Sequence, residues 1–337
     1  MWRSRDTAAL FAIKTTLFGL LLTPVDLLLQ VVEKRFYRSA SKPRLPLIFV
    51  CGASRTGTTL VSQVLIKHLP VAYINNFAAL FPRSPITASL LCKKLIQTQR
   101  ITYGSYYGKT AHFTGPNEGF YIWNRWMKAD PSGVRCVLMD SKIDDMIRFF
   151  GAYEEAFKKP LLNKNNSLNT RASSIAKVFQ NSYFICMTRD RAYLAQSLLQ
   201  ARMELQGNVR APLWIDNPDK PKNRNMDYVQ DVCEQVLYHE RKIKEQQNII
   251  GPERFWIVSY EEFCKAPDKL VKQVAEKILR QPLDNETVAT SLKPFNHSNT
   301  VRLKPELFED INKTFVRLQE KPQTNPDFEI GEAPSTR

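Results

Sequence analysis

The sequence lacks several patterns that would each point to a class of protein. Its six cysteines include no C-x-x-C pair and show no metal-ligand spacing, so neither a metal site nor a dithiol redox centre is expected. Cysteines used in this way fit a reducing compartment. No long block of Lys or Arg occurs, although the net charge is +15. The charge predicts an anionic partner, such as a nucleotide or a phospholipid surface, while the scatter of the basic residues argues against nucleic acid.

A long apolar run is also missing. The uncharged stretch from Thr15 to Val25 is shorter than the roughly 20 residues that a membrane-spanning helix needs. Residues 7–32 are nevertheless rich in Leu, Phe and Val with basic flanks, and Thr23 followed by Pro24 is typical of a helix start. We expect a hairpin of two short helices within residues 1–41, which lies in a membrane interface, packs on the domain or spans the bilayer.

The sequence shows no signal-peptide cleavage site. The expected location is the cytoplasm, with peripheral attachment to a membrane as an addition, or the Golgi membrane if the source is a eukaryote.

The stretch from Leu45 to Leu65 organises the rest of the chain. Its apolar residues 47–50 predict a buried strand of a parallel sheet, and apolar residues recur at helical spacing over 60–65. Between them, residues 52–59 are small or carry hydroxyl groups. A strand, a small-residue loop and a helix in this order direct backbone N–H groups and the positive end of a helix dipole at one place. The sequence therefore predicts an anion-binding loop.

This loop differs from a nucleotide P-loop at one position. The spacing from Gly52 to Gly57 matches that motif, but Thr58 stands where the motif requires Lys. The missing lysine argues against an enzyme that uses Mg-ATP or Mg-GTP. Arg55, inside the loop, instead offers a planar set of donors to a doubly charged oxyanion.

Strands alternate with helices along the rest of the chain. Apolar runs predict further strands at 71–74, 134–139, 183–188 and 255–260, and helices at 84–97, 120–127, 169–179, 191–203, 226–248 and 268–279. This alternation predicts an α/β fold, a P-loop-like doubly wound parallel sheet with helices on both faces. Residues 42–320 would form this domain, with a polar, loosely patterned stretch from about Pro294. Residues 321–337 would be a disordered tail.

Two later segments add candidate anion ligands. Arg189 falls at the carboxyl end of a predicted strand, and Ser197 lies about two helical turns into the next helix, so both can reach one phosphate. Lys164 stands in a predicted polar turn after the apolar pair Leu161 and Leu162. Taken singly, such residues more often form surface ion pairs, bond to their own helix backbone or lie in solvent.

In combination, the three segments resemble a known family. RTGTT after a strand, NKN before a helix and RDRAYLAQS after a strand resemble the sulfotransferases that use 3′-phosphoadenosine 5′-phosphosulfate (PAPS) as donor. The likeness is closest to the branch of bacterial enzymes and protein-tyrosine sulfotransferases, and it covers about residues 45–280. VSYEEF at 258–263 resembles a further element of that family, whereas Asn166 replaces the proline usual in its lysine-bearing turn.

The resemblance implies roles for individual residues. Arg55, Thr56, Gly57, Thr58 and Thr59 would hold the 5′-phosphosulfate. Arg189 and Ser197 would hold the 3′-phosphate, and Lys164 would stabilise the leaving phosphate. Glu118, in GPNEGF, would be the catalytic base, although it lies farther from the first loop than in the protein-tyrosine enzymes. No metal is implied.

The base and the acceptor stay open. His112 is the alternative base, because an imidazole titrates near neutral pH. The loop from Tyr103 to Tyr121 and the segment around Trp214 are rich in aromatic residues, which predicts a hydroxyl-bearing carbohydrate, lipid or other small molecule more than a protein tyrosine. Two rival functions remain. One is a kinase-like nucleotide enzyme, with Asp140 as its acidic strand end, and the other is a non-catalytic membrane-surface protein on the same fold.

Overall fold

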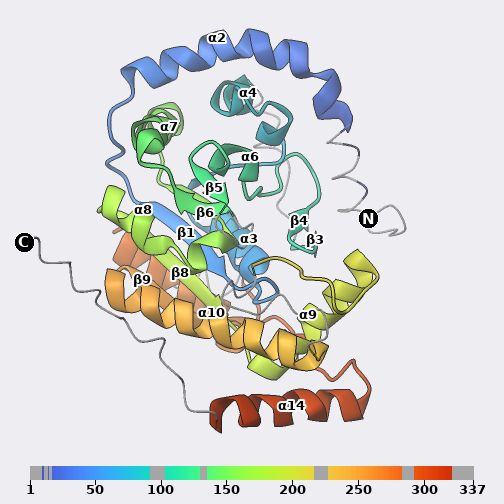
Figure 1. The fold of residues 1–337 in the computed structure, drawn as a ribbon. Coiled ribbons are helices and arrows are strands. Elements are labelled where there is room, and N and C mark those ends of the chain that lie inside the picture. Colours follow the sequence, from blue (N-terminus) through green and yellow to red (C-terminus); the bar gives the residue numbers. More distant parts are fainter. Residues whose placement is uncertain are drawn as a thin grey trace, which may run out of the picture.

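The computed structural model describes residues 10, 14, 17–91, 103–129, 135–215, 227–282 and 292–320. A five-stranded parallel sheet lies at its centre, with strand order β2–β7–β1–β8–β9 (Figure 1). After β1 the chain forms β2 and β7 on one side and then β8 and β9 on the other, so the winding reverses at β1. This confirms the doubly wound α/β fold, whose ligands bind at such a reversal. The strands are β1 (Leu47–Gly52), β2 (Ala72–Tyr73), β7 (Leu161–Lys164), β8 (Ser182–Thr188) and β9 (Phe255–Ser259).

β1 is buried along its whole length because helices cover both faces of the sheet. Phe49 packs into one apolar core and Val50 into the other, as the two-residue period of a strand requires. The first core includes residues of α6 (Phe120–Trp123), α7 (Ile143–Phe157) and α8 (Ala172–Val178). The second includes residues of α3 (Thr58–His68), α11 (Tyr260–Lys265), α12 (Pro267–Gln273) and a π-helical turn (Val274–Ile278).

A further apolar cluster joins α9 (Arg191–Gln206), α10 (Tyr228–Ile250) and α14 (Pro305–Glu320), which lie together at the lower side of Figure 1. Ile311 and Phe315 place one face of α14 in this cluster. The stretch after Pro294, expected to be loosely patterned, is therefore ordered through residue 320. The tail predicted to be disordered, residues 321–337, lies outside the described residues.

One predicted strand is wrong. Residues 134–139 were expected to lie in the parallel sheet, but β6 (Arg135–Leu138) pairs antiparallel with β5 (Met127–Ala129) in a separate two-stranded sheet. The central sheet instead contains β7, at a place where the sequence predicted a polar turn. Asn163 and Lys164 are 2% and 5% exposed within it, so the polar residues that hid this strand belong to the interior. The helix α7 was not predicted.

The predicted helices at the N-terminus are present. Residues 17–21 are helical, and a turn at Leu22 leads into α2 (Thr23–Ser39), which crosses the outside of the molecule beside α4 (Pro85–Leu91) and α7 (Figure 1). Thr23 does not cap this helix, because its hydroxyl donates to the carbonyl of Leu20 at 2.8 Å. Within the described residues, no helix combines the length and the hydropathy required to cross a bilayer.

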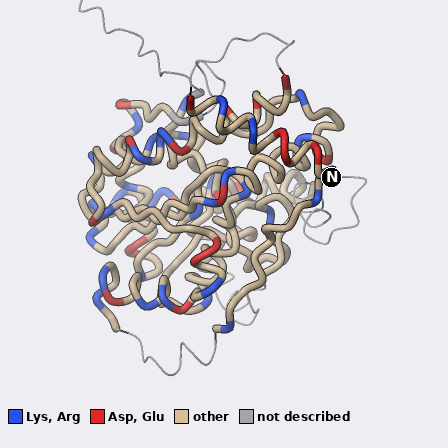
Figure 2. Tube along the Cα trace, turned by 90° about the horizontal axis from the view of Figure 1, so that it is seen from below, with Lys and Arg blue, Asp and Glu red and all other residues tan. Residues whose placement is uncertain are grey.

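The basic residues are spread over the chain. Figure 2 shows Lys and Arg positions scattered over the trace, with Asp and Glu positions among them. The charge of +15 therefore acts as a general positive field, and local arrangement must decide where an anion binds.

Candidate active site

The loop between β1 and α3 is the starting point of the site. Gly52, Arg55 and Gly57 have φ angles of 147°, 77° and 84°, which turn the chain so that α3 begins at Thr58. A Cβ atom at Gly57 would collide with the ring of Tyr260, so only glycine fits there. The positive φ angle of Arg55 is a strained backbone conformation, which costs a non-glycine residue about 1–3 kcal/mol in free energy. Because the first N–H groups of a helix have no intrahelical acceptors, the loop and α3 present donors on one side.

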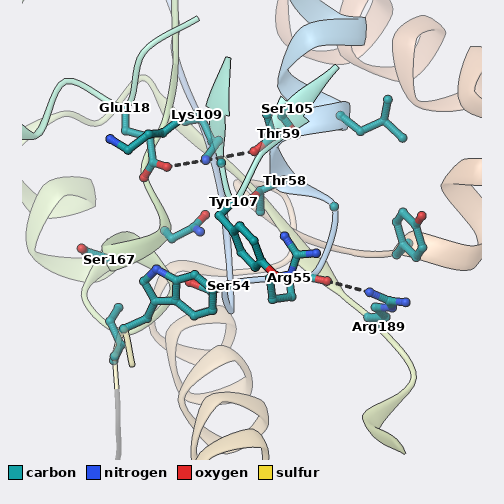
Figure 3. Close-up of a pocket in the computed structure, with 18 of the residues that line it drawn as sticks. Ser54, Arg55, Thr58, Thr59, Ser105, Tyr107, Lys109, Glu118, Ser167 and Arg189 are labelled. Atoms are coloured by element: carbon teal, nitrogen blue, oxygen red, sulfur yellow. Dashed lines mark hydrogen bonds and ion pairs between the residues drawn. The ribbon is translucent and has the colours of Figure 1, made fainter. Parts of the chain in front are cut away.

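This side of the loop opens into a cavity of about 700 Å³. Its wall is built from the loop, from the carboxyl ends of β7 and β8, and from segments that are distant in sequence (Figure 3). The predicted site residues in the wall are Arg55, Gly57, Thr58, Thr59, Glu118, Lys164 and Arg189.

Lys164 and Glu118 meet at one end of the cavity. Nζ of Lys164 lies 2.5 Å from Oε1 of Glu118 and donates to Oγ1 of Thr59 at 3.1 Å, so that Glu118 and Thr59 lie on either side of it (Figure 3). Asn163, the neighbour of Lys164 on β7, donates to the backbone carbonyl of Glu118 at 3.3 Å. The structure thus brings together the predicted base and the predicted leaving-group lysine.

A small hairpin lies over this ion pair. It consists of β3 (Ser105–Tyr106) and β4 (Lys109–Thr110), and its turn residues Tyr107 and Gly108 have φ angles of 48° and 86°. Two positive φ angles are typical of a tight hairpin turn. A Cβ atom at Gly108 would lie 3.2 Å from Oε1 of Glu118 and 3.3 Å from Nζ of Lys164. The loop singled out in the sequence therefore forms part of the cavity wall.

Two arginines form another part of the wall. Nε of Arg55 donates to Oγ of Ser197 at 3.0 Å, and its guanidinium carbon lies 4.7 Å from the centre of the Tyr107 ring. Arg189 donates to the carbonyl of Arg55 at 3.0 Å. Burial lowers the pKa of Arg55 and also that of Arg189.

Neither guanidinium forms an ion pair with a carboxylate of the described residues. Neutral side chains stand between them and acidic groups. Tyr107, stacked on Arg55, donates to Glu204 at 2.5 Å, and Asn299, bound by Nε of Arg189 at 3.0 Å, donates to Glu261 at 2.6 Å. Two partly buried positive charges near one another, with no carboxylate partner in the described part of the chain, make this part of the cavity suited to an anion.

Four predicted or weighed residues lie outside the cavity wall. Thr56 is 1% exposed and its hydroxyl donates to the carbonyl of Ala53 at 2.7 Å, so it shapes the loop from behind. Ser197 reaches the site only through Arg55. His112 is exposed on the surface, and Asp140 is exposed after β6, which belongs to the separate two-stranded sheet.

Some of the residues that complete the site were not predicted. Ser298 accepts from Nη2 of Arg189 through its carbonyl at 3.0 Å and its hydroxyl at 3.2 Å. The same guanidinium lies over the ring of Tyr260, which belongs to the VSYEEF segment noted in the sequence. Ser298 and Asn299 come from the polar stretch after Pro294 and are 109 and 110 positions from Arg189, so no local pattern marks them. Tyr107 and Gly108 carried one signal, an aromatic residue next to glycine in a long irregular segment.

The chain matches a known family over the segment that contains the predicted site residues. The model of the Sulfotransferase family matches residues 46–281, more than two thirds of the 337-residue chain. The chain belongs to the sulfotransferase family. This confirms the resemblance drawn from RTGTT, NKN and RDRAYLAQS.

Solved sulfotransferases have a similar fold. The structure is similar to sulfotransferase STF9 from Mycobacterium avium, with 19% identity, 84% of this chain and 78% of that chain covered, and a TM-score of 0.51. It is also similar to sulfotransferase STF1 from Mycobacterium tuberculosis H37Rv, with 12% identity, 89% and 86% covered, and a TM-score of 0.52. At these identities the likeness shows the fold alone. A search of curated protein sequences found no match.

Proposed function

We propose that this sulfotransferase moves a sulfuryl group from PAPS to the hydroxyl of an acceptor by in-line displacement. The observation that supports this most directly is that one cavity combines the Lys164–Glu118 pair with two partly buried guanidiniums, which have no carboxylate partner among the residues that the structure describes. The guanidiniums fit a doubly anionic donor, and the Lys164–Glu118 pair fits proton transfer beside a developing negative charge.

The donor set of the cavity fits PAPS. Arg55, Thr58, Thr59 and the N–H groups of the loop would hold the 5′-phosphosulfate, and Arg189 would hold the 3′-phosphate through charge-assisted hydrogen bonds. Ser197 is proposed to share the 3′-phosphate with Arg189, and its contact with Arg55 links the two anion positions. Ser298 and Asn299 orient Arg189 for this role.

Each residue of the Lys164–Glu118 pair has a separate task in the proposed mechanism. PAPS, when bound, supplies the sulfuryl group, whose bond to the phosphate oxygen breaks as its bond to the acceptor oxygen forms. Glu118 accepts the proton of the acceptor hydroxyl. Lys164 donates to the leaving oxygen, where negative charge develops, and Thr59 keeps the ammonium in position.

The acceptor side of the cavity supports a small hydroxyl compound. Near Glu118 the wall combines apolar and hydrogen-bonding side chains from Ser105, Lys109, Phe120 and Asn124, with Trp214 from a separate loop. A carbohydrate, a lipid head group or another small molecule fits this mixture better than a purely apolar ligand.

The kinase-like alternative has no support at this site. Thr58 replaces the lysine of a nucleotide P-loop, and Asp140 lies outside the cavity wall. Two experiments test the proposal. The first is calorimetry with adenosine 3′,5′-bisphosphate and, separately, with Mg-ATP. The second is an assay of transfer from radiolabelled PAPS to a panel of hydroxyl compounds. We expect the bisphosphate to bind without metal and label to appear in an acceptor. Binding of Mg-ATP alone would favour a nucleotide enzyme.

A further inference from the structure

The helix α2 has an unusual distribution of side chains, and this concerns a part of the molecule outside the proposed catalytic function. Its only acidic residues, Asp26 and Glu33, are 1% and 2% exposed, whereas Leu28 in the same helix and Leu21 just before it are 73% and 76% exposed. A helix on the surface of a soluble domain normally turns its apolar face inward and its charged face outward. The acidic residues of α2 follow the opposite arrangement.

The inward face explains how α2 is held. Glu33 accepts hydrogen bonds from the N–H groups of Ile86 and Thr87 and from the Thr87 hydroxyl, and Asp26 accepts from the hydroxyl of Ser84 at 2.6 Å. Apolar residues of the same face, among them Leu29 and Phe36, pack against the domain beside these contacts. The helix is thereby fixed in orientation, and its outward face is a consequence of that docking.

The outward face is apolar over several turns. Leu28 and Val31 of α2 belong to it, and the helical residues just before α2 extend it with Leu17, Phe18, Leu20 and Leu21. These six side chains are 49–76% exposed. More than half of the large apolar side chains that are exposed in the described part of the chain lie between residues 10 and 32. The remaining ones are single residues on different elements. An apolar patch of this kind marks an interaction surface.

The charges around this face indicate what covers it. Lys14, Lys34, Arg35 and Arg38 are exposed at the two ends of the face, and between residues 7 and 46 the sequence has no acidic residue besides the two that are buried. Exposed leucines between basic residues fit the boundary between the head groups and the acyl chains of an anionic bilayer. No helix of the described residues is able to span that bilayer.

We propose that the outward face of α2 docks the protein on the surface of an anionic membrane, with the leucines inserted among the lipids and the basic residues against the head groups. The acidic side chains, which an anionic surface would repel, are turned into the domain. The protein would therefore bind as a peripheral protein whose catalytic domain stays in water.

Flotation with vesicles tests this on the full-length chain. Vesicles of phosphatidylcholine alone are compared with vesicles of phosphatidylcholine and phosphatidylserine, at low and at high salt. We expect binding to the mixed vesicles, weakened by salt, and a loss of at least about tenfold in the double variant L21Q/L28Q. The matched control is I249Q/V316Q, since Ile249 and Val316 are both 56% exposed on α10 and α14. This control should bind as the wild type does.

Two results would overturn the proposal. One is equal flotation of the wild type and L21Q/L28Q, and the other is no flotation of the wild type. If the wild type does not float and light scattering shows a dimer that L21Q/L28Q converts to a monomer, the face is assigned to contact with a second copy of the chain. Circular dichroism and thermal unfolding of each variant confirm that it is folded, so a loss of binding cannot come from unfolding. These readouts do not depend on sulfuryl transfer.

Discussion

The amino ends of α3 and α4 offer the same physical feature, and the protein uses them differently. Both ends carry N–H groups without intrahelical acceptors and the positive end of a helix dipole. At α4, carboxylates of the protein itself occupy this place, because Glu33 and Asp26 reach it from α2. At α3 the corresponding place faces the cavity, where Arg55 and Lys164 stand instead of carboxylates.

The difference separates a structural contact from a candidate binding site. Internal carboxylates satisfy the end of α4 and fasten α2 to the domain. At the end of α3, the one carboxylate among the described wall residues is Glu118, and Lys164 holds it. The donors of α3 therefore remain open to an anion from outside, and the partly buried Arg55 and Arg189 have no carboxylate partner within the described ranges.

The largest expected effect is that of Glu118→Gln, which keeps the shape of the side chain and removes its basicity. If Glu118 takes the acceptor proton, kcat should fall by about 10²–10⁴. Affinity for adenosine 3′,5′-bisphosphate, measured by calorimetry, should be unchanged. Glu253→Gln, on an exposed surface residue, is the control. Near-normal kcat would mean that another group removes the proton.

Lys164→Ala tests the role of the lysine cation in the cavity at the amino end of α3. We expect kcat to fall by about 10²–10³, because the ammonium acts mainly as charge develops on the leaving oxygen. Lys128→Ala, which removes an exposed lysine, should have little effect. An unchanged kcat with a raised KM for PAPS would assign Lys164 to binding of the ground state.

Arg189→Ala tests whether the unpaired guanidinium binds a phosphate. A charge-assisted contact contributes about 1.5–3 kcal/mol, so affinity for adenosine 3′,5′-bisphosphate should fall roughly tenfold to a hundredfold. Arg189 also holds Ser298, and thermal unfolding therefore serves as a check of the fold. Arg44→Ala is the exposed control. Unchanged affinity in a folded variant would contradict the role.

Glu33→Ala tests the structural contact at the amino end of α4. It leaves the N–H groups of Ile86 and Thr87 without their acceptor, which should lower the free energy of unfolding by about 1–3 kcal/mol. Denaturant titration measures this, with Glu253→Ala as the control. Activity per folded molecule should persist, since α2 lies outside the cavity wall. If Glu33→Ala lowers the free energy of unfolding no more than Glu253→Ala does, the contact of Glu33 with α4 is not stabilising.

The smallest expected effect is a pH dependence from the same residue. Burial raises the pKa of Glu33 above its usual 4.5, although the hydrogen bonds from Thr87 and Ile86 oppose this. The folded state then binds more protons than the unfolded state, so this contribution to stability is complete below pH 4.5 and is lost as the pH rises through the raised pKa. Denaturant titrations from acidic to neutral pH should show the wild type losing stability relative to Glu33→Gln. A constant difference would contradict the raised pKa.

Much of the fold could be predicted because its signals are local. The apolar residues of β1 and the small residues of the following loop are contiguous, and β1 is buried on both faces as expected. The strand β7 was missed for a physical reason. Asn163 and Lys164 carry polar groups that are satisfied by Trp123, Glu118 and Thr59, which come from other segments. A strand whose polar residues find partners only in the folded protein looks like a turn in the sequence.

Sequence by itself determined the central sheet's β1–α3 loop, the candidate ligands Arg55, Lys164 and Arg189, and the family, because each rests on a short run of residues with a fixed local geometry. Only the tertiary structure decided which candidate base meets Lys164, since Glu118 and His112 lie six positions apart in one irregular segment and the fold turns only Glu118 into the cavity. It likewise decided that Asp26 and Glu33 face inward. A helical pattern defines the faces of α2, but the donors of α4 that select one face come from a different part of the chain.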